Sequence, residues 1–148
     1  MANLHLDRTR PAGETTATEE RPAQHLVGSI LMFDFDVEIA GLRREGAWAR
    51  DNHNAKTLVK DDDVRVILIA MKTGARLPEH HGPTRITIQT LTGRLGIVTS
   101  EGTIDLPAGS LVTLEGGLPH EIEALEESAF LLTIAWRTAD PHPLESRA

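Results

Sequence analysis

The chain has 148 residues with 15 basic and 22 acidic side chains, and its formal net charge of -7 has the wrong sign for neutralising nucleic-acid phosphates. It has no cysteine, which excludes disulfides, thiolate metal sites and cysteine nucleophiles and suits a reducing cytoplasm. No apolar run approaches the roughly twenty residues of a membrane helix, and the first two dozen residues lack the apolar centre of a secretory signal. We therefore expect one cytoplasmic domain that binds neither nucleic acid nor membrane.

The two ends of the chain are predicted to be loose. Residues 1–25 mix Thr, Pro, Ala, Glu and Arg without hydrophobic periodicity, so apolar burial cannot offset the entropy of ordering them. They are expected to form a flexible N-terminal tail, or an arm on a second subunit. Residues 139–148 are expected to form a C-terminal tail, which leaves residues 26–138 for a single barrel.

The first segment after the tail alternates between apolar and polar residues. In Leu31–Ile39 every second residue is apolar, which predicts a strand with one face on the core and the other in water. Gly41–Asp51 interrupts the alternation, and we expect a short helical turn around Leu42–Glu45 with Trp48 as a buried anchor.

The rest of the chain is a series of short strand-like segments separated by residues that favour turns. The further predicted strands are Ala55–Val59, Val64–Met71, Arg85–Leu91, Leu95–Thr99, Thr103–Leu106, Leu111–Leu114, Glu121–Ala124 and Ala129–Trp136. Gly93, Gly109 and Gly117 lie between them and are expected to supply positive φ angles. This pattern predicts an all-β fold, a sandwich or jelly roll of two antiparallel sheets.

Two glycine-containing motifs in the second half resemble those of the cupin family. The first motif runs from Gly74 through His80 to Gly93, and the second contains Leu106-Pro107-Ala108-Gly109 and Glu115-Gly116-Gly117-Leu118-Pro119-His120. The resemblance covers Gly74–Ile134, most of the barrel. It implies the double-stranded β-helix of the small RmlC-like cupins.

The resemblance also implies a metal site, of which this chain has half. Metal-binding cupins take His-x-His and Glu from the first motif and His from the second. The matching positions here are His80, Gly82, Ile86 and His120, so two donors are missing. His81 does not replace one, because adjacent strand residues point to opposite faces. A divalent transition metal (Zn, Ni, Fe, Mn or Cu) on His80 and His120 would need a further donor. The candidates are Thr87, Gln89, Glu79, Glu115 and His53.

The function expected from this barrel is binding of an unidentified small molecule in its interior. The predicted pocket is mostly apolar and consists of His80, Ile86, Ile88, Gln89, Leu114, His120 and Ile134. One alternative is a metal-dependent enzyme of the dioxygenase or isomerase type that uses His80 and His120. Another is a structural dimer, because a homodimer is expected through the apolar edge of Leu31–Ile39.

Overall fold

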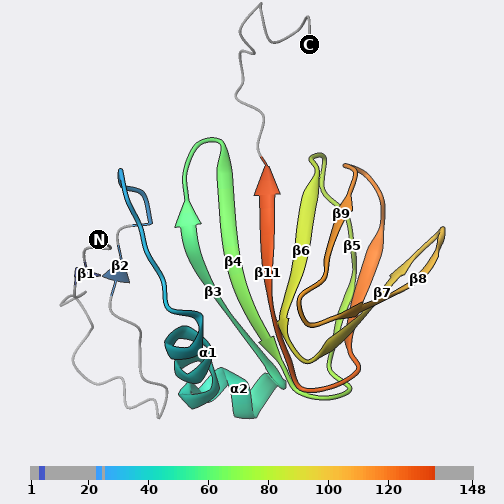
Figure 1. Ribbon diagram of the computed structural model, residues 1–148, viewed down its shortest axis with the longest axis horizontal. Helices are drawn as coiled ribbons and strands as arrows, with labels where there is room; N and C mark the ends of the chain where they lie inside the picture. Colours follow the sequence, from blue (N-terminus) through green and yellow to red (C-terminus); the bar gives the residue numbers. More distant parts are fainter. Residues whose placement is uncertain (1–3, 6–22, 25, 136–148) are drawn as a thin grey trace, which may run out of the picture.

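The computed structural model describes residues 4–5, 23–24 and 26–135. Two antiparallel sheets curve around a shared interior (Figure 1). The larger has the order β3-β4-β11-β6-β9, formed by His53–Lys60, Val64–Met71, Ser128–Ala135, Ile86–Thr92 and Leu111–Leu114. The smaller has the order β5-β10-β7-β8, formed by Arg76–His80, His120–Ala124, Arg94–Thr99 and Gly102–Pro107. A separate two-stranded sheet consists of β1 (Leu4–His5) and β2 (Ala23–Gln24), which are antiparallel, with Leu4 opposite Gln24.

The main core lies between the two sheets. Alternate residues of each strand point inward, so Ile88 on β6 and its partner Leu132 on β11 share the inner face. Ile97 on β7 and Ile122 on β10 face them from the smaller sheet. Phe130 is the largest fully buried side chain of this core, which is otherwise aliphatic and sulfur-containing.

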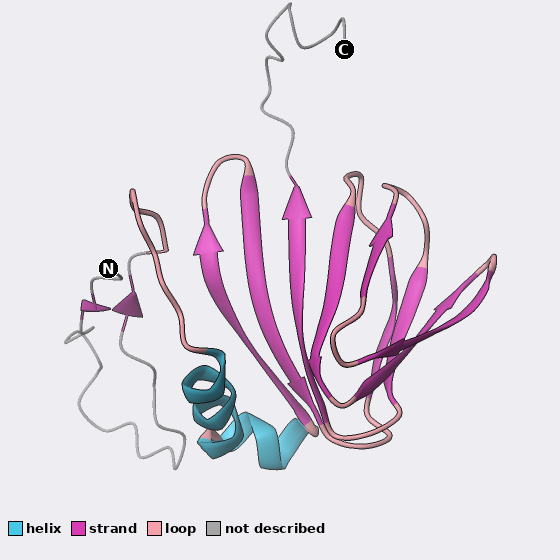
Figure 2. Cartoon of the chain, viewed as in Figure 1, coloured by secondary structure: helices cyan, strands magenta, loops and turns pink. Residues whose placement is uncertain are grey.

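A second core lies on the outer face of the larger sheet. Helix α1 (Phe35–Arg44) and helix α2 (Gly46–Asp51) pack there, close to β3 (Figure 2). Ile39 and Leu42 of α1 lie against Leu58 and Leu68 of the sheet. This layer covers the outer face of the larger sheet near β3 and β4.

The predicted strand over Leu31–Ile39 was wrong, because α1 begins in the middle of it. Asp34 is the N-cap residue, and its Oδ1 accepts hydrogen bonds from the amides of Asp36 (3.0 Å) and Val37 (3.3 Å). Acidic residues in the first turn and basic residues in the last complement the helix dipole. The predicted helical turn around Leu42 is the end of this helix, and Trp48 on α2 is half-buried against the second core.

The other predicted strands are confirmed within two residues at each end, as far as the described part of the chain reaches. One strand, β5, was missed because Pro78 lies within it. β5 pairs with β10 alone and is therefore an edge strand, where a residue without an amide hydrogen is tolerated. The pairing also shifts register beside Pro78, between His120 and Ile122. In the described residues no helix is long and apolar enough to cross a membrane.

Candidate functional site

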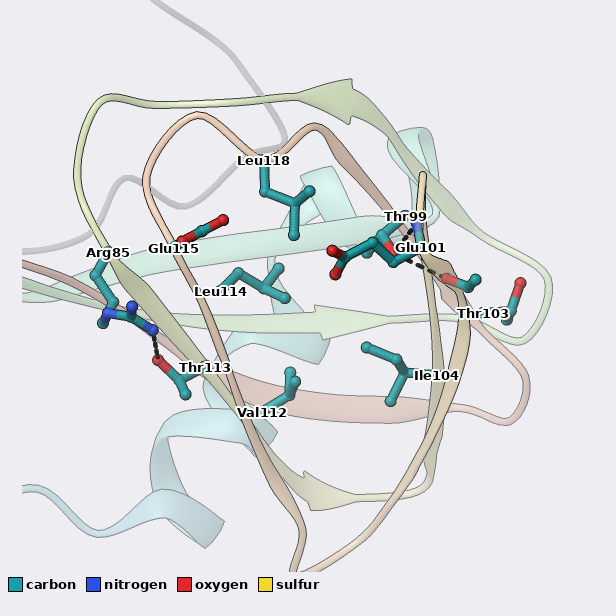
Figure 3. A pocket seen from close by; sticks show the side chains of 11 residues that line it. Arg85, Thr99, Glu101, Thr103, Ile104, Val112, Thr113, Leu114, Glu115 and Leu118 are labelled. Atoms are coloured by element: carbon teal, nitrogen blue, oxygen red, sulfur yellow. Dashed lines mark hydrogen bonds between the residues drawn. The ribbon is translucent and has the colours of Figure 1, made fainter.

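A hollow of about 460 Å³ opens at one end of the barrel, beside the β7–β8 turn (Figure 3). We call it the mouth pocket. Its apolar floor is formed by Ile104, Val112, Leu114 and Leu118. Its rim is polar and consists of Arg85, Thr99, Glu101, Gly102, Thr103, Thr113 and Glu115. The lining is therefore more polar than apolar, with the apolar side chains gathered in the floor.

The strand registers explain why the floor is apolar. Val112 and Leu114 on β9 pair with Ile88 and Ile86 on β6, so all four share the inner face of the larger sheet. Ile104 on β8 pairs with Ile97 of the core in the same way. The floor is therefore the exposed end of the main core, where the two sheets diverge.

Glu101 is carried by the tight turn between β7 and β8. The Thr99 hydroxyl donates a hydrogen bond to the Gly102 carbonyl (2.9 Å) and accepts one from the Glu101 amide (3.1 Å). These two bonds fix the turn from within. In Figure 3 the Glu101 carboxylate points from the turn into the hollow, toward Leu114 and Leu118.

Glu115 lies on the opposite side of the hollow, in the segment between β9 and β10 (Figure 3). This segment packs against the segment that leads into β6. The Gly117 amide donates to the Gly82 carbonyl (2.7 Å), and a Cβ at Gly116 would collide with the Pro83 carbonyl. The loop that carries Glu115 and Leu118 is therefore held by backbone contacts.

Arg85 is the one basic residue that lines the mouth pocket. Its Nη1 donates to the Thr113 hydroxyl (3.1 Å), which itself donates to the Ile86 carbonyl (3.3 Å). Thr113 pairs with Thr87, and both alternate with inward-facing neighbours, so they lie on the outer face of the sheet. This hydrogen bond holds the guanidinium at the part of the rim formed by Thr113.

The two motif histidines lie on neighbouring strands. The backbone of His80 on β5 is the direct partner of His120 on β10, although forty positions separate them. His120 is 3% exposed and lies on the inner face, beside its other partner Thr99 of the mouth pocket. Its Nδ1 lies 3.2 Å from the Leu118 carbonyl. Because a carbonyl only accepts, Nδ1 carries the proton, which is the usual tautomer of a metal-ligating histidine.

The described side chains do not form a metal shell. No three histidine, aspartate or glutamate side chains among them converge, and the side chain of His80 lies outside the described set. Thr87 and Gln89 pair with Thr133 and Leu131 in unbroken register, so they face outward. His53, with Nδ1 3.0 Å from the Asp51 carbonyl, lies at the far end of the larger sheet. His81 and Glu79 are exposed, and Glu115 lies in the mouth pocket.

The residues predicted to line the pocket divide into three groups. Leu114 lines the mouth pocket, and Ile86, its cross-strand partner, lies next to Ile134 at the same end of the barrel. Ile88 is fully buried and belongs to the packed core. Gln89 faces the outer side of the sheet, and Trp136 and the tail 139–148 lie outside the described residues.

The mouth pocket contains residues that the sequence reasoning did not select. Glu101 was not selected, although charged turn residues beside an open strand end are candidates for ligand contacts. Val112 could have been found, because it alternates with Thr113 and therefore shares a face with Leu114. The juxtaposition of Glu101 with Glu115 depends on tertiary structure, since no local pattern links the two turns.

Comparison with known proteins gives the fold. No family profile matches the sequence, and no curated protein matches it. Solved structures do match. A conserved protein of unknown function from Streptococcus pyogenes is 23% identical, with 61% of this chain and 79% of that chain covered and a TM-score of 0.57. A cupin superfamily protein from Desulfitobacterium hafniense is 18% identical, with 57% and 78% covered and a TM-score of 0.56.

An enzyme is also among these structures. Salicylate 1,2-dioxygenase from Pseudoaminobacter salicylatoxidans, in a mutant form, is 13% identical, with a TM-score of 0.63. The match covers 70% of this chain and 34% of that enzyme. Likeness at these identities establishes the architecture, and the function has to be argued from the site.

Proposed function

Because this chain is a small barrel with the cupin fold, a scaffold that carries many unrelated activities, we propose its function from the mouth pocket. The protein binds a small organic molecule there. The observation that supports this proposal is the hollow itself, whose volume of about 460 Å³ lies within the range of ligand sites. The apolar body of the ligand would rest on Val112 and Leu114, and its polar groups would meet the rim.

The site proposed here lies nearer the end of the barrel than the interior pocket predicted from the sequence. Ile88 and Phe130 are fully buried in the packed core, which leaves the deeper interior to side chains. The hollow opens at the end of the barrel that carries Leu114. Ile86 and Ile134 lie beside Leu114 on the inner face of the larger sheet.

The experiment is an NMR titration of the ¹⁵N-labelled full-length protein with 1-hexanol, a neutral probe with an apolar body. We expect saturable shifts at the amides of Ile104, Val112 and Leu114. Val112→Trp fills the floor and should abolish the shifts, whereas Val66→Trp, on the outer face of the same sheet, should keep them. Shifts spread over the whole surface, or unaffected by Val112→Trp, would contradict the proposal.

A metal-dependent cupin enzyme of the dioxygenase or isomerase type is the second candidate function. The backbone pairing of His80 with His120 and the Nδ1 contact of His120 favour it. Catalytic zinc sites use three protein ligands, and no three histidine, aspartate or glutamate side chains converge among the described residues. Metal analysis of untagged protein, purified without chelators, tests it. Stoichiometric Zn, Ni, Fe, Mn or Cu that is lost in His120→Ala would support a site on these histidines.

We also propose that the protein works in the cytoplasm, on the ground that the chain has no cysteine. Cell fractionation with an antibody against the native chain would test this location. Recovery of the protein with the periplasmic or secreted fraction would contradict it.

A further inference from the structure

The mouth pocket contains two acidic side chains that are not neutralised by a basic one. Ion pairs elsewhere in the described part of the chain involve Glu38, Glu121, Glu123, Glu127, Asp51 and Asp105. Within residues 26–135, Glu101 and Glu115 are absent from these pairs. They stand on opposite sides of the hollow (Figure 3).

The basic residue of the rim does not balance them. The Arg85 guanidinium also lines the hollow, but its printed hydrogen bond is to the Thr113 hydroxyl, and two carboxylates stand against this one basic group. Thr99, the polar neighbour of Glu101, uses its hydroxyl within the turn. The charge presented over Leu114 and Leu118 is therefore negative.

Two carboxylates above an apolar floor favour a ligand with a positive charge. A carboxylate that loses water when a ligand covers it must regain an interaction, and a cationic group supplies both charge and hydrogen bonds. The formal net charge of -7 adds a long-range attraction for cations. An anionic ligand of the same shape would be repelled by both carboxylates.

We infer that the ligand of the mouth pocket is an organic cation, with an ammonium group placed between Glu101 and Glu115 and an apolar body on Ile104, Val112, Leu114 and Leu118. This inference rests on the proposed function, because it names the class of molecule for the same site. The Glu101 turn and the Glu115 loop are fixed by hydrogen bonds and close backbone packing, so the backbone that carries the two charges is positioned before a ligand arrives.

The test compares three probes with the same six-carbon body and different charge. Hexylammonium, 1-hexanol and hexanoate are titrated separately into the ¹⁵N-labelled full-length protein at low ionic strength. The shifts are followed at the floor amides. An exposed charge pair contributes up to about fivefold in affinity. With about twofold from each of the two carboxylates, we expect hexylammonium to bind about fourfold more tightly than 1-hexanol. Hexanoate should bind most weakly of the three.

The controls separate pocket charge from overall charge. The double variant Glu101→Gln and Glu115→Gln should lose the preference for hexylammonium and retain 1-hexanol binding. Asp62→Asn with Asp63→Asn changes the net charge equally, in the exposed β3–β4 turn, and should leave the preference intact. Equal affinity for hexylammonium and 1-hexanol at the floor amides would overturn the inference while the proposed function stands. If none of the probes shifted these amides, both would fall.

Discussion

At Gly93 the chain turns from β6 into β7 with a φ of 79°, a conformation that favours glycine. The three predicted turn glycines all have positive φ, with 87° at Gly109 and 84° at Gly117. Gly93 differs from Gly109 in its surroundings. A Cβ at Gly93 would meet the Glu127 carbonyl and would lie 2.8 Å from the Ser128 Cα, whereas a Cβ at Gly109 has nothing within 4 Å.

This difference predicts unequal effects of the same substitution. Gly109→Ala should lower the free energy of unfolding by about 1–2 kcal/mol, through backbone strain alone. Gly93→Ala adds a collision with backbone atoms of the turn before β11, and should cost at least about 1 kcal/mol more. Urea unfolding of the two variants measures both costs. Equal destabilisation would show that the turn before β11 moves aside freely.

Among the elements, α1 begins in a segment whose residues alternate like a strand. Asp34 provides the local signal that decides for a helix, because its carboxylate accepts hydrogen bonds from two amides of the first turn. The ion pair between Lys56 and Glu38, at 2.7 Å, then attaches the helix to β3. Asn54 adds a buried hydrogen bond of 3.0 Å to the Leu42 carbonyl at the other end of α1.

Removing the cap should destabilise the helix. Asp34→Ala is expected to lower the free energy of unfolding by about 1 kcal/mol, because two amides lose their acceptor. Asp34→Asn keeps a side-chain oxygen at the cap and should cost only a few tenths of that amount. The measurement is urea unfolding followed by Trp fluorescence, since Trp48 lies on the adjoining helix. A loss of similar size in both variants would mean that charge, and not capping, stabilises this end.

The hairpin of β7 and β8 carries Glu101 and is tied by a two-point ion pair. Arg94 Nε and Nη2 lie 2.7 and 2.6 Å from the two carboxylate oxygens of Asp105. The hydrogen bonds from Arg94 lower the pKa of Asp105 below its ordinary value, and Asp105 in turn raises the pKa of Arg94. An acid whose folded-state pKa is depressed stabilises the fold above its unfolded pKa, and this contribution disappears as the pH falls through the folded pKa.

We therefore predict that NMR titration of the side-chain carboxyl gives Asp105 a pKa below the ordinary value of an aspartate. In Arg94→Gln the pKa of Asp105 should return toward its ordinary value. Asp105→Asn should remove the part of the acid dependence of stability that is due to this pair. Because both side chains are exposed, the effect on stability should be small and should decrease with added salt. An Asp105 pKa that is unchanged by Arg94→Gln would contradict the assignment.

At the scale of the whole molecule, the barrel could be predicted from sequence because its signals are local. Alternation along Val64–Met71 and turn glycines such as Gly93 determine strands one by one, and the spaced motifs ending in His120 indicate how the strands combine. The mouth pocket depends on two turns that meet only in the fold. The helix α1 was missed because its first apolar residues alternate with polar ones, as in a strand. Its helical signal is the spacing of three residues between Ile39 and Leu42, the two buried residues of α1.

The segment that leads into α1, together with α1 itself, leaves apolar side chains on the surface. Val27, Ile30, Met32 and Val37 are exposed by 48, 73, 79 and 62%. The segment that leads into α1 starts beside β3, where the Lys60 amide donates to the Leu26 carbonyl (Figure 1). The predicted homodimer loses its original basis, since no edge strand runs over Leu31–Ile39. This surface gives it a different one, because exposed apolar patches on small domains commonly mark contacts between chains.

The dimer remains our proposal, and the patch now determines how it should be tested. Deleting residues 1–40 would remove Ile39 and uncover Leu58 and Leu68, so truncation would disturb the fold itself. Met32→Lys with Val37→Lys instead places charge on the exposed apolar side chains and leaves the buried face of α1 untouched.

We expect the unaltered chain to have a dimeric mass by light scattering at micromolar concentration, with an interface above about 1,000 Å², and the double variant to be monomeric. Leu111→Lys, on the exposed face of β9 (56% exposed), is the matched control and should remain dimeric. A monomeric mass for the unaltered chain would rule the dimer out, and a double variant that stays dimeric would move the interface away from this patch.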